Sequence, residues 1–425
     1  MSEPANINYM VIRNWSSKGA RLLNNFPALV VLGARQVGKS TFARQLGADW
    51  LYLDLENPLD AERILNNPEL FFMDHPRHVI LDEVQAHPEI FKILRGVIDK
   101  DRSQRGRFII TGSASFELIA QVSESLAGRV AIMEMHPLAQ NELKEKPRAA
   151  FFDIFENPLS EVAGERLLSL KSGLDNSGSF KSREAMLWGG YPEPALRRDS
   201  EFRIDWYENY FLTYIQRDIL ALFPKLDLIK YRRVIQMLSH LSHSIINRSE
   251  IARSIEASEK SVRDYLEIIE GTYFWRSLPA FQTAKIKTTV KMPKGHFRDT
   301  GLCCFLQNLH SASELETYPR LGNLFEGFVV EEIIRGVEAS RARRLQYSHF
   351  RTKAGGEIDL ILEGSFGMLP IEVKYGSNTP RTELRAMQNL MEIHGLPLGL
   401  VINHSPRPSR ITEKIFQIPA SCLFF

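Results

Sequence analysis

Two acidic side chains near the C-terminus are spaced so that they could share a metal ion, and a lysine lies beside them. In GEIDLILEGSFGMLPIEVKYG, residues 356–376, apolar and charged side chains alternate on either side of a Gly-Ser-Phe-Gly segment. This period of two predicts a tight β-hairpin. If residues 365 and 366 form a two-residue loop, Asp359 lies opposite Glu372 on one face of the hairpin, and Lys374 lies one step further along that face.

Opposed carboxylates at this spacing need an explanation. Two unit charges about 5 Å apart repel by about 3 kcal/mol at an effective dielectric constant near 20, whereas a favourable cross-strand pair contributes only about 0.2–1 kcal/mol. The arrangement therefore requires a compensating cation, a shared proton or full exposure to solvent. A bound Mg²⁺ or Mn²⁺ would supply the cation and lower the pKa of a bound water, and Lys374 would then steady the nucleophile or a phosphate.

The alternative is a solvated hairpin without metal chemistry. In that interpretation Glu357 and Lys374 pair across the strands, and Arg351 and Lys353 dilute the repulsion between the two carboxylates. Both interpretations are compatible with the residue types alone, because a cluster of carboxylates in a sequence identifies only a candidate metal site.

A second chemistry-bearing motif lies near the N-terminus. The apolar run at residues 28–32 leads into Gly-x-x-x-x-Gly-Lys-Ser at residues 33–40, and a helical pattern follows. In this strand–loop–helix setting the backbone N–H groups converge on a phosphate at the helix N-terminus. Lys39 would neutralise phosphate charge, and Ser40 would ligate Mg²⁺. We expect the nucleotide-binding residues to be Gly33, Ala34, Arg35, Gln36, Val37, Gly38, Lys39, Ser40 and Thr41.

The motif needs an acidic partner at the end of another buried strand, and RHVILDEVQ supplies it. The apolar residues 79–81 are followed by Asp82, which we assign to the metal, and Glu83, which we assign as the base that polarises the attacking water. Further apolar strands are predicted within residues 50–56 and 107–115, with a helix over residues 88–100 between them. Strands of this kind separated by helices predict a parallel sheet covered on both faces.

Composition sets broad limits. The chain has 425 residues, 44% of them hydrophobic and 24% charged, with a net charge of +2, so two to four ordinary globular domains are expected. The three cysteines, Cys303, Cys304 and Cys422, have neither zinc-site spacing nor a disulfide pattern. No apolar run approaches the roughly 20 residues that span a bilayer, and no secretory signal leads the chain. We therefore expect a cytoplasmic protein that does not bind a membrane.

Residues 247–281 contain two short amphipathic patterns separated by Glu-Ala-Ser, which predicts a helix-turn-helix followed by a basic wing. The second helix carries both signs of charge: Glu259, Asp264, Glu267 and Glu270 against Lys260 and Arg263. Since affinity for phosphate comes from Lys and Arg, a structural role is favoured over DNA binding for this helix. The wing lysines, Lys285, Lys287, Lys291 and Lys294, keep DNA contact open, whereas Trp275 and Phe281 are expected in the core.

The chain as a whole resembles a large group of prokaryotic AAA-type P-loop ATPases that carry a C-terminal domain of unknown function. The matching segments, in chain order, are GARQVGKST, YLDLEN, ILDEVQ, TGSAS, LAGR, GGYPE, YIQRDI, PKGHFRDTGL and GEIDLIL followed by IEVK. The last of these is similar to the PD-(D/E)xK nuclease core, in which an Asp and a Glu-x-Lys bind divalent metal and activate water. The similarity implies that Asp359, Glu372 and Lys374 have these roles, and that Glu326 on the preceding helix joins the metal ligands.

The resemblance also implies roles for residues around the nucleotide. A polar residue at the end of the strand over residues 107–115 would sense the γ-phosphate, and we expect Ser113 there, with Thr111 as the alternative. Arg129 and Arg217 are candidates to reach the γ-phosphate, in cis or from a neighbouring subunit, and a structural ion pair is the alternative for each.

These inferences combine into one expected architecture of class α/β. It consists of an AAA-type ATP-binding core with a parallel sheet (1–136), a helical lid (137–225), a winged-helix module (226–295) and a restriction-endonuclease-like α/β domain (296–425). The expected function is Mg²⁺-dependent ATP hydrolysis coupled to metal-dependent DNA cleavage or remodelling, with Mg²⁺ or Mn²⁺ at the C-terminal site. The alternative is a nucleotide-dependent switch whose silent nuclease-like scaffold binds a protein partner. Nucleic acid, a protein partner and a homo-oligomer are the partner classes that these alternatives imply.

Overall fold

A computed structural model of the 425-residue chain describes residues 11–113, 122, 124–171, 181–282 and 290–425. The chain divides into two compact units. We call residues 13–137 together with 267–274 the P-loop unit, and the other described residues, 11–12, 138–266 and 275–425, the C-terminal unit. Within the described residues, no helix is long and apolar enough to cross a bilayer.

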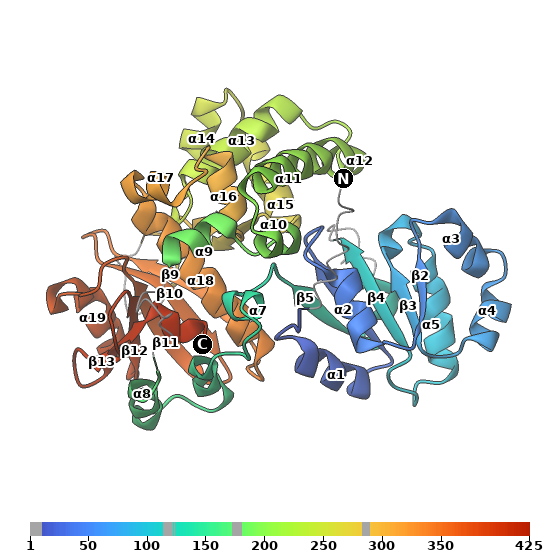
Figure 1. Ribbon diagram of the computed structural model, residues 1–425, viewed down its shortest axis with the longest axis horizontal. Helices are drawn as coiled ribbons and strands as arrows, with labels where there is room; N and C mark the ends of the chain where they lie inside the picture. Colours follow the sequence, from blue (N-terminus) through green and yellow to red (C-terminus); the bar gives the residue numbers. More distant parts are fainter. Residues whose placement is uncertain (1–10, 114–121, 123, 172–180, 283–289) are drawn as a thin grey trace, which may run out of the picture. The chain divides into compact units, whose positions relative to one another are not determined.

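The P-loop unit is built on a five-stranded parallel sheet with the strand order β2-β3-β4-β1-β5 (Figure 1). The strands are β1 (Ala28–Gly33), β2 (Leu51–Asp54), β3 (Val79–Asp82), β4 (Phe108–Ser113) and β5 (Val130–Met135). The helices are α1 (Ser16–Asn25), α2 (Lys39–Leu46), α3 (Pro58–Leu65), α4 (Pro68–Asp74) and α5 (Ile90–Lys100), with a 3-10 turn at Val84–Ala86. Every residue of β1 is buried, as continuous apolar strands in a covered parallel sheet require. The predicted parallel sheet is confirmed.

Two sheets organise the C-terminal unit. The larger has the order β13-β14-β12-β11-β10-β9, and the smaller, β6-β8-β7, is antiparallel. The strands are β6 (Ser244–Ile245), β7 (Trp275–Leu278), β8 (Lys294–Phe297), β9 (Gln346–Arg351), β10 (Glu357–Gly364), β11 (Gly367–Val373), β12 (Gly399–Asn403), β13 (Ser409–Arg410) and β14 (Ile415–Pro419). In the larger sheet β9, β10 and β11 are antiparallel neighbours, whereas β11, β12 and β14 run parallel.

Helices of the C-terminal unit lie between and around these strands (Figure 1). They are α7 (Gln140–Leu143), α8 (Glu161–Leu168), α9 (Ser182–Trp188), α10 (Pro192–Arg197), α11 (Ser200–Thr213), α12 (Leu220–Leu222), α13 (Leu228–His240), α14 (Arg248–Ser254), α15 (Glu259–Gly271, of which residues 267–271 belong to the P-loop unit), α16 (Thr300–Leu306), α17 (Ala312–Thr317), α18 (Leu321–Ala339) and α19 (Arg385–His394), with a π-helical segment at Tyr214–Ile219 and 3-10 segments at Ala150–Glu156, Arg381–Leu384 and Ala420–Leu423. Helix α18 is buried along most of its length and packs against β10 and β11.

The expected boundaries of a lid, a winged-helix module and a nuclease-like domain stay predictions, whereas residues 138–266 form one compact unit with residues 275–425. Buried polar contacts explain this. The backbone N–H of Gln140 donates to Glu332 of α18, and Arg335 of the same helix donates to the carbonyl of Leu138. A Cβ on Gly164 of α8 would lie 2.5 Å from the ring of Phe416, so this helix packs directly on β14.

The C-terminal hairpin forms with the predicted register. Gly364 pairs with Gly367, and the ladder continues to Leu360 opposite Ile371. The connection is therefore the two-residue loop that the Gly-Ser-Phe-Gly segment indicated.

Candidate functional site

The P-loop begins where β1 ends, and glycine is required at its first position. Gly33 has φ +149°, and a Cβ there would lie 2.3 Å from the carbonyl oxygen of Met135 on β5. Gly38, with φ 91°, caps the N-terminus of α2, so that Lys39 is the first residue of the helix. The Nζ of Lys39 is buried and donates to the carbonyls of Gly33 and Ala34, at 3.2 and 3.0 Å. The loop thus has the geometry that presents a helix N-terminus and an ammonium group to a phosphate.

The acidic pair lies at the same edge of the sheet. Asp82, the last residue of β3, is buried and accepts hydrogen bonds from the hydroxyls of Tyr52 and Thr111. Oxygen donors such as Asp82 and Ser40 suit Mg²⁺. Tyr52 was missed by the sequence reasoning, although its place in the neighbouring strand β2 could have indicated it.

Glu83 leaves the strand in a left-handed conformation, with φ 51°. Its carboxylate accepts from the hydroxyl and the N–H of Ser113, at 2.7 and 3.1 Å, and from the side-chain amide of Gln85 at 2.6 Å. Burial alone would raise the pKa of Glu83, but the charge of Lys39 and these hydrogen bonds lower it below the usual value. Glu83 is therefore an ionised carboxylate held beside Lys39, as a base that polarises water must be.

Strand register brings these residues together. Gly33 pairs with Ser113 across β1 and β4, and β3 lies on the other side of β4. The predicted residues from Gly33 to Thr41, together with Asp82, Glu83 and Ser113, therefore gather at the carboxyl edge of one sheet. Whether Ser113 senses the γ-phosphate stays a prediction, since its hydroxyl is bound to Glu83.

Arg129 lies at the opposite edge. It immediately precedes Val130, which pairs with Ala28 at the start of β1, so it is roughly 20 Å from the level of Gly33 at about 3.3 Å per residue. Its guanidinium makes two bonds to Asp99, at 2.8 and 2.9 Å. The prediction that Arg129 contacts the γ-phosphate in cis is therefore wrong, and only a contact from a neighbouring subunit stays open. Arg217 lies in the π-helical segment, and its side chain is outside the described residues.

The C-terminal hairpin places its acids in the protein interior. Asp359 and Glu372 are 2% and 4% exposed, which excludes the solvated hairpin. Asp359 Oδ2 accepts a hydrogen bond from the backbone N–H of Val373 at 2.9 Å. The carboxylate of β10 therefore contacts the backbone of β11 just beyond the last paired residues, Leu360 and Ile371.

A lysine from another sheet supplies the compensating cation. The Nζ of Lys294, on β8, lies 2.7 Å from both Asp359 and Glu357 and 3.9 Å from Glu326. Burial disfavours its charge, but attraction by these carboxylates outweighs burial and raises the pKa of Lys294. Lys294 is 2% exposed, so the expectation that it contacts DNA as a wing residue is wrong.

The expected pair of Glu357 and Lys374 is also wrong. Glu357 binds Lys294 and, at 3.6 Å, Arg351, whereas Lys374 binds Glu372 at 2.6 Å. Burial and the charge of Asp359 raise the pKa of Glu372 well above its usual range. The repulsion between the opposed acids is thus relieved in two ways, by lysines and by a carboxyl group that favours its neutral form.

The potential metal ligands differ from the predicted set in one member. His243, Glu326 and Asp359 each offer a ligand atom, and these atoms lie within 4.8 Å of one another. Within the described residues this group contains His243 and not Glu372. Burial and the nearby Lys294 lower the pKa of His243, so its imidazole is neutral, as coordination requires. A cavity of about 200 Å³ opens onto this cluster and is lined by His243, Ser244, Ile245, Lys294, Asn323, Glu326, Arg351, Glu357, Asp359 and Lys374.

Comparison with known proteins supports part of this picture. Residues 25–144 match the family described as AAA domain, while residues 179–313 and 321–423 match two families described as domains of unknown function, DUF8612 and DUF4143. The uncharacterized proteins Rv2008c of Mycobacterium tuberculosis and Mb2031c of Mycobacterium bovis are each 29% identical over 420 residues, which is 98% of this chain and 86% of theirs. The AAA match and the loop geometry together support a P-loop ATPase of the AAA type in the first third of the chain.

Solved structures with partial likeness include the RuvB Holliday junction branch migration motor of Thermotoga maritima. It is 13% identical, with a TM-score of 0.30, over 65% of this chain and 93% of that chain. The ORC1 protein of Aeropyrum pernix in complex with DNA is 14% identical, with a TM-score of 0.28, over 74% and 97%.

Proposed function

We propose that the chain is an Mg²⁺-dependent AAA-type ATPase whose nucleotide cycle controls a nuclease-like C-terminal unit acting on nucleic acid. The observation that carries the ATPase part is the convergence of Lys39, Asp82 and Glu83 at the carboxyl edge of one parallel sheet. This edge is where open α/β sheets bind their ligands.

Each residue has a distinct task in hydrolysis. The loop amides and Lys39 hold the phosphates, and Lys39 neutralises charge as the terminal phosphoryl group leaves. Ser40 and, through water, Asp82 would hold Mg²⁺, which would supply positive charge to the phosphates. Glu83 accepts a hydrogen bond from the attacking water and orients it in line, since Ser113 and Gln85 hold this carboxylate in place.

Phosphate release measured with malachite green tests the ATPase. Lys39→Ala should lose turnover, and Glu83→Gln should keep nucleotide binding while its turnover falls at least a hundredfold. Lys92→Ala, an exposed lysine on α5, is the matched control and should behave as wild type. Wild-type turnover in Lys39→Ala would show that the assignment is wrong.

The order of elements supports the nuclease-like part. Helix α18, the antiparallel strands β9, β10 and β11, helix α19 and the parallel strand β12 follow the αβββαβ order of the PD-(D/E)xK core. In this arrangement Asp359 lies on β10, Glu372 on β11 with Lys374 just beyond it, and Glu326 on the preceding helix.

Glu372 also offers an acceptor for a cation. Its Oε2 is buried and has no hydrogen-bond partner among the described residues, and an unpaired buried acceptor suits a metal ligand. His243, Glu326 and Asp359, whose ligand atoms lie within 4.8 Å of one another, would hold Mg²⁺ or Mn²⁺ together with Glu372, and the ion would lower the pKa of a bound water. Lys374 would stabilise the charge that develops on the phosphate.

Elements α13, β6, α14, α15, β7 and β8 occur in the order of a winged helix, with β6-β8-β7 as its sheet. We assign it a structural role, because β8 delivers Lys294 to the carboxylate cluster. Trp275 is 2% exposed, which confirms its expected place in the core. Lys285 and Lys287 lie outside the described residues, and Lys291 stays a candidate for nucleic-acid contact.

Incubation of plasmid or single-stranded DNA with Mn²⁺ tests cleavage. Asp359→Ala should abolish it, whereas Glu363→Ala, which removes another acid of β10, should not. Circular dichroism of both variants separates lost chemistry from lost folding. Cleavage unaffected by Asp359→Ala would remove the nuclease proposal.

One observation favours a second candidate, a nucleotide-dependent switch with a catalytically silent scaffold that binds a protein partner. Lys294 already pairs with Asp359 and Glu357, and Arg351 supplies a second positive charge beside Glu357, so these two carboxylates are balanced without a metal ion. Calorimetry distinguishes the two candidates: the nuclease requires Mn²⁺ binding that Asp359→Ala weakens, and the switch requires none.

A further inference from the structure

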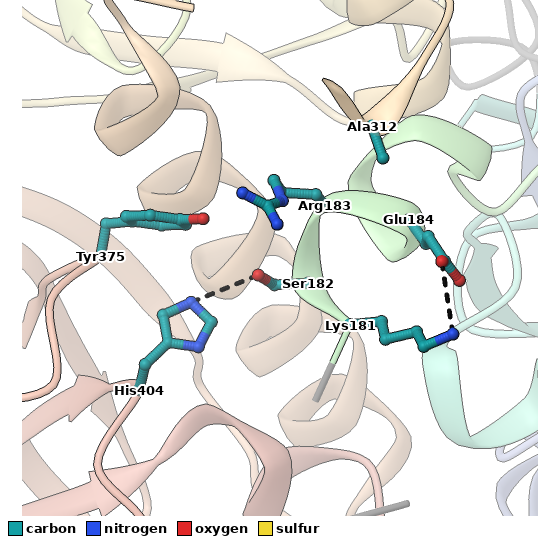
Figure 2. A pocket seen from close by; sticks show the side chains of 7 residues that line it. All are labelled: Lys181, Ser182, Arg183, Glu184, Ala312, Tyr375 and His404. Atoms are coloured by element: carbon teal, nitrogen blue, oxygen red, sulfur yellow. Dashed lines mark hydrogen bonds and ion pairs between the residues drawn. The ribbon is translucent and has the colours of Figure 1, made fainter. Parts of the chain in front are cut away.

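A second cavity of the C-terminal unit lies beside the carboxylate cluster and has a different chemistry. Its volume is about 450 Å³, within the range of small-molecule sites. It is lined by Lys181, Ser182, Arg183, Glu184, Ala312, Tyr375 and His404 (Figure 2). We propose that this cavity binds one nucleotide of a single-stranded nucleic acid, a proposal that rests on the nuclease-like function and names its substrate class.

The cavity and the carboxylate cluster share one edge of the large sheet. Tyr375 follows Lys374 at the carboxyl end of β11, and His404 follows β12, the parallel neighbour of β11. The N–H of His404 donates to the carbonyl of Gly376 at 3.0 Å, which holds the two strand ends together. Both the cavity and the carboxylate cluster therefore take residues from the chain at the carboxyl end of β11, Tyr375 in the cavity and Lys374 in the cluster.

One wall is aromatic. The ring of His404 stacks on Phe325, with centroids 4.6 Å apart, and Tyr375 meets His404 edge-on at 5.0 Å. Phe325 is fully buried and precedes Glu326 on α18, so the wall is anchored on the helix that also supplies the cluster. Burial and the charge of Arg183 lower the pKa of His404 to about 4, which leaves a neutral imidazole. Rings of this kind stack with nucleobases irrespective of sequence.

The other wall is polar and carries two cations, of which Lys181 is paired with Glu184 of the same wall at 3.5 Å. Figure 2 shows the guanidinium of Arg183 pointing toward the hydroxyl of Tyr375, with Ser182 below it. The Ser182 hydroxyl and His404 Nε2 are 3.3 Å apart. Arg183 forms an ion pair of 3.1 Å with Glu316, whose side chain is 63% exposed. A phosphate can compete with such an exposed carboxylate for the guanidinium, because surface ion pairs are weak. Base stacking on one wall and phosphate binding on the other match a single nucleotide.

The aromatic wall favours a single strand over a duplex. In a duplex, both faces of each base are covered by its neighbours, so a base must be unstacked before it can contact a side-chain ring. A duplex presents its phosphates but not its base faces, and would use the cationic wall alone.

Fluorescence anisotropy of labelled 12-nucleotide DNA and RNA strands, with the full chain in EDTA, tests the proposal without metal or cleavage. Arg183→Ala and Tyr375→Ala should each weaken binding about tenfold. Arg183→Ala should also reduce the slope of log affinity against log salt by about 0.7. Glu316→Gln should strengthen binding, because it releases Arg183. Arg197→Ala, an exposed arginine outside the cavity, is the matched control and should stay within twofold of wild type.

The outcomes separate this proposal from the proposed function. Wild-type affinity in both Arg183→Ala and Tyr375→Ala would overturn it, as would equal losses with a 12-base-pair duplex. Preference of the wild type for the DNA or the RNA strand identifies the substrate. If the two variants lose strand binding but the wild type does not cleave with Mn²⁺, the cavity proposal stands and the nuclease proposal fails. If Asp359→Asn loses cleavage while strand binding does not depend on the cavity, the reverse holds.

Discussion

The ammonium of Lys294 lies 2.7 Å from Asp359 Oδ1, although the two residues are 65 positions apart in the chain. One comes from a three-stranded sheet and the other from a six-stranded sheet. Their pairing answers the question that the hairpin acids raise, because a cation from outside the hairpin balances carboxylates that would otherwise repel one another.

Removing that cation should destabilise the protein. Lys294→Met is expected to cost about 3 kcal/mol of unfolding free energy, since breaking a buried ion pair leaves uncompensated charge. If the carboxylates form a metal site, Mn²⁺ should restore part of this loss and raise the melting temperature of the variant more than that of wild type. Scanning fluorimetry with and without Mn²⁺ measures both effects. Lys291→Met, an exposed neighbour, should leave the melting temperature unchanged, and equal stability of the two variants would contradict the prediction.

Ser113 should act through Glu83. Its hydroxyl binds that carboxylate at 2.7 Å, so Ser113→Ala should lower the ATPase turnover about tenfold and leave KM for ATP nearly unchanged. A double-mutant cycle with Glu83→Gln distinguishes positioning from direct contact with the γ-phosphate. If Ser113 positions Glu83, adding Ser113→Ala to Glu83→Gln should not lower the turnover further. If the two losses in turnover multiply in the double variant, the Ser113 hydroxyl contacts the γ-phosphate directly.

Glu332 should make stability depend on pH. Burial raises the pKa of this carboxyl from 4.5 to about 7 in the folded protein. The folded state therefore holds a proton that the unfolded state has released, and stability from this group is complete below pH 4.5 and is lost as the pH rises through 7. Glu332→Gln removes this dependence. Relative to wild type, the unfolding free energy of the variant should rise by on the order of 3 kcal/mol between pH 4.5 and pH 8, as measured by urea unfolding. A difference in unfolding free energy that stays the same at all pH values would refute the assignment.

Two glycines of α18 provide a matched packing test. A Cβ on Gly336 would lie 2.1 Å from the ring of Phe152, whereas one on Gly322 would meet nothing within 4 Å. Gly336→Ala should therefore destabilise the protein by about 2 kcal/mol through overpacking, and Gly322→Ala should stabilise it by about 0.5 kcal/mol. Chemical denaturation of the two variants measures the contrast. Equal effects would mean that the aromatic cluster around Phe152 yields to an added methyl group.

Local patterns predicted which residues of the first third meet at one edge of the sheet, because the segments that supply them are local. The loop from Gly33 to Ser40 is contiguous, and parallel strands necessarily end at the same edge, so Asp82 and Glu83 had to lie near it. The hairpin register followed from its two-residue loop, since Gly364 opposite Gly367 determines every later pair.

Local sequence patterns could not predict contacts between segments that are far apart in the chain. His243 and Lys294 enter the carboxylate cluster from elements whose sequences give no sign of Asp359, and Lys294 looked like a solvent-facing member of a basic wing. The prediction for Arg129 was wrong for a different reason, because a motif identifies a residue type but not the edge of the sheet at which that residue lies. In all three cases, the position of the side chain depends on how distant segments pack in the folded protein.

The crowding around Gly33 also limits how its motif can be dissected. With the carbonyl of Met135 only 2.3 Å from the place of a Cβ, any side chain would force two neighbouring strands apart. Loss of ATP binding in a Gly33 variant would thus report a damaged scaffold as readily as a missing phosphate contact. Gly33 therefore serves two purposes, because it lets β5 pack closely against β1 and it is also the first residue of the P-loop.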